Sequence, residues 1–152
     1  MRNRRGFTLI ELLVVTFLLG ILASIAVLKY MDMRNHAIAA QMSQELRAIT
    51  VAVLNYHAGT ETWPAEVGGG AVPPELNGLL PGQLSGSFDR SQYMLDYENF
   101  GPGAPQIMIG VSVTSSDPKL FAKFVQYMGT QSPFFVSGSR MTYLISGPGG
   151  IF

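Results

Sequence analysis

The feature that most constrains this chain is an apolar run of roughly 22 residues that follows Gly6 and ends at Leu28. At about 1.5 Å of rise per residue, such a helix is roughly 33 Å long, enough to cross the hydrocarbon core of a bilayer. Basic flanks stay on the cytoplasmic side of a membrane, so the sequence predicts that everything after Lys29 lies across it. The basic flank here consists of Arg2, Arg4 and Arg5.

The apolar run contains one formal charge, the carboxylate of Glu11. A carboxylate in lipid costs on the order of a few kcal/mol unless it is paired, neutralised or able to reach the interface. One explanation is that Glu11 lies close enough to the cytoplasmic boundary for its side chain to reach water. The other is that a partner for this carboxylate arrives when chains assemble.

One stretch of the chain resembles the processing site of type IV prepilins and type II secretion pseudopilins: Gly6-Phe7-Thr8-Leu9-Ile10-Glu11. The resemblance also covers the basic leader before the cut and the long apolar segment. The resemblance implies that a bacterial prepilin peptidase cuts between Gly6 and Phe7 and methylates the new amino group of Phe7. Glycine suits the cut because it has no side chain to obstruct an extended backbone. The resemblance also implies that Glu11 pairs with the Phe7 amine of a neighbouring subunit. This pairing would offset the free-energy cost that either charge has alone in lipid.

Composition limits the possible functions. With 152 residues, 47% of them hydrophobic, the chain can form one membrane helix and one modest domain. Loss of the three leader arginines would leave seven basic against ten acidic residues, and no basic cluster outside the leader indicates nucleic-acid contact. The chain has no cysteine, so it differs from the many major pilins with a disulfide-closed loop. This difference favours a pseudopilin or a minor pilin.

A single long helix is expected to join the membrane to the soluble part of the protein. The first proline is Pro64, so nothing forces a break before it, and only Gly20 is a weak point where a kink is possible. Gly59 is the candidate C-cap. Apolar residues in the second half of the helix recur at steps of three and four, as one buried face requires: Ile38, Met42, Leu46, Ile49, Val53 and Tyr56.

The second half of the chain predicts a small antiparallel sheet. In the first expected strand, Tyr93, Leu95 and Tyr97 lie on one face, whereas Met94, Asp96 and Glu98 lie on the other, as in a half-buried strand. Further strands are expected at residues 106–114, 134–136 and 141–146.

One extra helix is expected between these strands. Asp117 and Pro118 mark its start and Gly129 its end. The predicted fold is therefore α+β and pilin-like, with the long helix packed on the sheet. Its expected segments are a cleaved leader (1–6), the transmembrane half (7–28) and amphipathic half (29–59) of the long helix, a Gly/Pro-rich loop (60–90), and the sheet domain (91–152) with its helix at about 117–128.

The sequence gives little support for a catalytic or metal-binding site. The spacing of Ser116 and Lys119 fits that of penicillin-binding enzymes, but no companion motif follows and a helix cap explains it better. His36 and His57 are too far apart along one helix to suggest zinc. The acids Asp89, Asp96 and Glu98 do not match the helix-loop-helix calcium spacing. We expect no enzymatic activity, no catalytic residue, no cofactor and no metal site.

The sequence thus predicts a structural subunit of a type IV pilus-like filament. Its expected partners are prepilin peptidase, the inner membrane and other pilin or pseudopilin subunits, with the C-terminal domain outside the cytoplasm. The sequence does not distinguish a pilus from a secretion pseudopilus or a DNA-uptake filament. It also does not distinguish a major from a minor subunit. Two alternatives are a secreted protein cut by signal peptidase after Ala26, and a single-pass anchored binding protein that does not polymerise.

Overall fold

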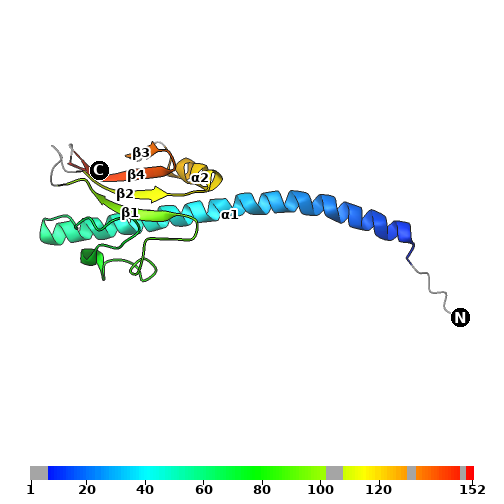
Figure 1. The fold of residues 1–152 in the computed structure, drawn as a ribbon, viewed down its shortest axis with the longest axis horizontal. Helices are drawn as coiled ribbons and strands as arrows, with labels where there is room; N and C mark the ends of the chain where they lie inside the picture. The colour runs from blue at the N-terminus through cyan, green and yellow to red at the C-terminus, as the bar shows by residue number, and fades with distance from the viewer. Residues whose placement is uncertain (1–6, 102–107, 130–132, 148–149) are drawn as a thin grey trace. The chain divides into compact units, whose positions relative to one another are not determined.

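The computed structural model describes residues 7–101, 108–129, 133–147 and 150–152 (Figure 1). The chain divides into two compact units, Met1–Asn35 and His36–Phe152. The elements are one long helix, a second helix and a small antiparallel sheet. The predicted α+β, pilin-like fold is therefore confirmed.

The first unit contains the beginning of helix α1 (Leu9–Thr60). This helix includes an 18-residue window with a mean hydropathy of 2.6, none of it buried. It is thus long and apolar enough to cross a membrane. The helix runs through Gly20 without interruption, and a Cβ atom at that position would have no atom within 4 Å apart from the neighbouring backbone of the helix itself.

In the second unit, the remainder of α1 contributes one face to the hydrophobic core. Four residues of the predicted face are buried at steps of four, three and four: Met42, Leu46, Ile49 and Val53. Ala39 and Ala52 are buried beside them. They join inward-facing sheet residues in the same core cluster, among them Leu95, Val111, Val113, Met141 and Ile145. Ile38 and Tyr56, at the two ends of the predicted face, are only partly buried.

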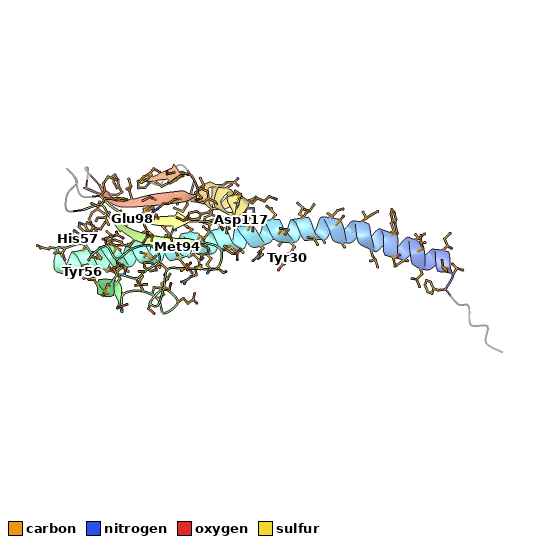
Figure 2. The ribbon with its side chains drawn as sticks, viewed as in Figure 1. Tyr30, Tyr56, His57, Met94, Glu98 and Asp117 are labelled. Carbon is orange, nitrogen blue, oxygen red and sulfur yellow. The ribbon has the colours of Figure 1, made fainter. Side chains whose placement is uncertain are left out.

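The predicted cap at Gly59 is wrong. Helix α1 continues to Thr60, and the residue with a left-handed backbone is Glu61, at φ 55°. The Glu61 N–H donates to the His57 carbonyl at 2.8 Å, which closes the last turn one residue later than expected. The His57 ring, labelled in Figure 2, also stacks on Trp63, with centroids 3.7 Å apart and planes 3° apart. This stack and the closing bond offset the roughly 1–2 kcal/mol that a left-handed conformation costs a residue with a side chain.

The sheet has the strand order β1-β2-β4-β3, and all pairs are antiparallel. Its strands are β1 (Met94–Asn99), β2 (Ile109–Thr114), β3 (Phe134–Ser137), β4 (Arg140–Gly147) and β5 (Gly150–Ile151), which pairs with β4. The short β5 is not predicted from the sequence. Residues 106 and 107, the expected start of the second strand, lie outside the described residues.

Helix α2 (Pro118–Met128) has the cap that its sequence indicates. The Asp117 side chain accepts hydrogen bonds from the backbone N–H groups of Lys119 at 2.9 Å and Leu120 at 3.3 Å. Gly129 follows the helix with φ 71°, a conformation that suits glycine. The helix-cap explanation of the Ser116 to Lys119 segment therefore agrees with the structure.

The segment between α1 and β1 covers the outer edge of β1. Its short 3-10 helix η1 (Pro74–Leu76) buries Leu76. The Phe88 carbonyl accepts from Leu95 N at 3.0 Å, and the Glu66 carboxylate accepts from Asn99 N at 2.7 Å. The outward-facing N–H groups of Leu95 and Asn99, on the outer edge of β1, are thus bonded within the same chain.

One polar residue of β1 is more buried than its pattern indicates. Asp96 lies on the sheet face opposite Leu95 but is only 9% exposed. It is covered by Arg140, whose guanidinium lies 3.3 Å from the Asp96 carboxylate and also pairs with Glu98. Burial, with the nearby charge of Glu66, raises the pKa of the Asp96 carboxyl, and Arg140 opposes that rise.

Candidate functional site

Helix α1 begins with a reciprocal pair of hydrogen-bonded side chains. Thr8 immediately precedes the first helical residue, Leu9, and Glu11 is the third residue of the helix. The Thr8 backbone N–H and hydroxyl both donate to Glu11 Oε2 at 2.8 Å, and the Glu11 N–H donates to the Thr8 hydroxyl at 3.3 Å. This arrangement is a capping box, which satisfies backbone N–H groups at the start of a helix.

Glu11 therefore has a partner within its own chain. Its negative charge also lies in the first turn, where the helix dipole favours an anion. Both accepted hydrogen bonds go to Oε2, and no described residue donates to Oε1. The carboxylate is thus held in place and still has one oxygen for a second donor.

Sequence reasoning missed this local partner, although the Thr-x-x-Glu signal was present. The two explanations considered for Glu11 were access to water at the membrane boundary and a partner from another subunit. The structure adds that Thr8 stabilises and orients the carboxylate before any second chain arrives.

The surroundings of the carboxylate are apolar. A shallow hollow of about 310 Å³ is lined by Phe7, Ile10, Glu11, Val14 and Val15. The Phe7 side chain is 81% exposed. An open apolar surface with a single carboxylate can accept a neighbouring apolar helix that carries one positive charge.

The structure brings together two of the predicted site residues, because Phe7 and Glu11 line the same hollow. Gly6 and the leader arginines, Arg2, Arg4 and Arg5, lie outside the described residues. Cleavage after Gly6 and methylation of Phe7 therefore stay predictions.

Two other groups that the sequence raised form no cluster. His36 lies 3.0 Å from Lys123 Nζ, and His57 is at the far end of the same helix, stacked on Trp63. Within the described ranges, no group of three or more His, Asp or Glu side chains is placed to hold a metal ion.

Residues 1–27 match the family described as the prokaryotic N-terminal methylation motif. The chain carries a type IV prepilin-like N-terminus. This prepilin-like chain is also 35% identical to the fimbrial protein EcpC of Eikenella corrodens over 78 residues, which cover 49% of each chain. It thus spans about half the length of that curated relative, and no solved structure matches it.

Proposed function

We propose that this protein is a structural subunit of a type IV pilus-like filament, most specifically a pseudopilin of a type II secretion system or a minor pilin. The observation that carries the proposal is the start of α1, where an oriented Glu11 carboxylate and Phe7 border an exposed apolar helix surface. Similarity to a protein named as fimbrial supports the filament role. The absence of cysteine supports the narrower assignment.

Assembly follows from the apolar surface of α1. The side chains of its membrane segment are exposed in one chain, so helices of neighbouring subunits gain packing contacts when they bundle. The Phe7 amine of one subunit then reaches the Oε1 atom of Glu11 in another. Because a buried unpaired charge is costly, this pair favours one axial register between neighbours.

The same proposal assigns partners and location. Prepilin peptidase removes residues 1–6 and methylates Phe7, while the apolar half of α1 holds the protein in the bacterial inner membrane. The sheet domain lies on the extracytoplasmic side. The role is structural and not enzymatic, as the similarity to a fimbrial protein supports.

Substitution of the residue before the cut tests this assignment. Gly6→Leu should leave the leader attached, because a branched side chain obstructs the extended backbone in a protease site. Intact mass measured on membrane fractions should show the full-length chain in the variant. Asn3→Ala, a leader change away from the cut, is the matched control and should be processed normally. Normal loss of the leader from Gly6→Leu would contradict the proposal.

A further inference from the structure

Acidic and basic side chains are separated along the sequence of the second unit. Between Arg47 and Arg90 the chain has no lysine or arginine but four acids, and from residue 118 onward it has three basic residues but no acid. The acids are Glu61, Glu66, Glu75 and Asp89, and the basic residues are Lys119, Lys123 and Arg140. The second unit therefore has one acidic stretch and one basic stretch.

Glu61 and Lys119 lie at opposite ends of this unit. Glu61 directly follows the end of α1, whereas Lys119 is the second residue of α2. Helix α2 approaches the beginning of the unit, because Lys123 Nζ lies 3.0 Å from His36 Nε2. At 1.5 Å per residue, the stretch of α1 from His36 to its end is about 36 Å long. Figure 1 shows the same arrangement, with α2 at the end of the sheet away from the last turn of α1.

Each of these two charges has the sign that its own helix end disfavours. The first turn of a helix favours an anion, and the last turn favours a cation. Lys119 nevertheless places an ammonium in the first turn of α2, where Asp117 supplies the anion that caps the helix, and Glu61 places a carboxylate just after the last turn of α1. Glu61 also has a left-handed backbone, at φ 55°, where glycine is usual. Local stability therefore explains neither side chain.

Both side chains are available for contact with another molecule. Each residue is exposed. Within the part of the chain that the structure describes, neither the Glu61 carboxylate nor the Lys119 ammonium has a hydrogen bond or an ion pair. The nearby Glu66 differs, because its carboxylate accepts from the N–H groups of Gly68 and Asn99. Two exposed charges of opposite sign at opposite ends of one unit are complementary when copies line up head to tail.

We propose that Glu61 of one copy pairs with Lys119 of another copy in the same fibre, with all α1 helices parallel. The partner is a second copy of this chain because one arrangement then satisfies both charges in every copy. A head-to-tail contact of this kind repeats without closing, as a fibre requires. The inference rests on the proposed function, because alignment in one fibre is what brings the two ends together.

The length of the unit indicates which copies meet. The axial offset of the Glu61 to Lys119 contact is about 36 Å, whereas Phe7 and Glu11 are roughly 6 Å apart along one helix. The copy that supplies Lys119 therefore lies further along the fibre than the copy that supplies the Phe7 amine. An exposed ion pair contributes little affinity by itself, but packing of the apolar helices holds the copies together and raises the local concentration of its partners. The pair thus selects the axial offset between sheet domains.

Carbodiimide treatment of natural fibres tests the contact without any substitution. The reagent joins a carboxylate to an amine that touches it, takes up the water that is lost, and leaves an amide. Because Glu61 and Lys119 lie at opposite ends of one unit, an amide between them must join two copies. Peptide mass spectrometry should find this cross-link. Lys119→Arg should lose the cross-link and keep the natural fibre yield, since a guanidinium keeps the charge and forms no amide under these conditions.

Charge reversal provides a second test. Lys119→Glu and Glu61→Lys should each lower fibre yield about fivefold, because an attractive pair becomes a repulsive one. Both changes suit their helix ends, so neither should unfold the second unit. The double variant should restore the natural yield, because it recreates the pair with the charges exchanged. Gln126→Glu, which adds a charge at an exposed position of the same helix, is the matched control and should assemble normally.

Three results would overturn the proposal. The first is natural fibres without a Glu61 to Lys119 cross-link, and the second is a double variant that assembles no better than the single ones. The third is a loss of membrane retention in Lys119→Glu with no effect of Glu61→Lys, which would identify an anionic lipid surface as the partner. Natural fibres that begin at Phe7 and lack the cross-link contradict this inference alone. A chain that forms no fibre contradicts the proposed function and this contact together.

Discussion

Glu11→Ala should be cleaved normally and yet enter fibres about 60- to 300-fold less than the natural protein. In the proposed assembly, the variant removes the acceptor for the Phe7 amine of the neighbouring subunit, and an unpaired charge in the bilayer costs about 2.5–3.5 kcal/mol. Since 1.4 kcal/mol is about tenfold in an equilibrium, that cost corresponds to the stated range. The measurement is the ratio of processed subunit in sheared fibres to processed subunit left in membranes.

The capping box supplies the matched control for this prediction. Thr8→Val removes the hydroxyl that donates to Glu11 Oε2 at 2.8 Å but keeps the carboxylate and the shape of the side chain. Loss of a cap costs about 1 kcal/mol, so this variant should lower fibre yield by only a few-fold. If Thr8→Val and Glu11→Ala reduce fibres equally, Glu11 acts through the helix cap and not through a second subunit. Natural fibre yield from Glu11→Ala would rule out its role in register.

Glu45→Ala should destabilise the second unit by about 3–5 kcal/mol, because it leaves buried polar partners without an acceptor. Glu45 is only 7% exposed. Its carboxylate accepts from Tyr93 Oη at 3.0 Å, from Gln41 Nε2 at 3.0 Å and from Arg90 Nε at 3.4 Å. Burial, reinforced by the Glu45 charge, raises the pKa of Tyr93, so the phenol remains protonated as a donor at neutral pH. Thermal or denaturant unfolding in detergent, followed by near-ultraviolet circular dichroism, measures the change.

Two further variants serve as controls for the Glu45→Ala prediction. Glu45→Gln keeps the volume and an acceptor for Tyr93, so it should cost clearly less than alanine. Gln44→Ala changes an exposed neighbour on the same helix and should stay within about 0.5 kcal/mol of the natural protein. The role assigned to Glu45 is wrong if its alanine variant unfolds like Gln44→Ala. Arg90 also donates to the carbonyl oxygens of Ser87 and Gln83, at 2.9 and 2.8 Å, so the effect should extend to that connecting segment.

Periodic features of the sequence predicted most of the fold. The spacing of Met42, Leu46, Ile49 and Val53 identified the buried face of α1 because helical periodicity is local and repeated. Asp117 identified the start of α2 for a similar reason, since a cap bonds to residues two or three positions away. Signals of this kind need no knowledge of the tertiary structure.

Features set by contacts distant in sequence could not be predicted in the same way. Asp96 is buried because Arg140, 44 positions later, lies over it, and the alternating pattern of β1 contains no sign of that pair. Two partners of Glu45, Arg90 and Tyr93, come from the segment between α1 and β1, 45 and 48 positions away. At the candidate site, the Thr8 cap could have been predicted from the Thr-x-x-Glu spacing. The apolar hollow shared by Phe7 and Glu11 could not, because it depends on how the side chains are placed in three dimensions.

The mature N-terminus tests the central claim most directly. Intact mass and N-terminal sequencing of the protein purified from membranes or fibres should show a chain that begins at Phe7 and carries one methyl group on its amine. A chain that begins at Val27 would identify an ordinary secretory signal, and an uncut leader would identify a membrane anchor that is not processed. Either of these results would contradict the filament-subunit account.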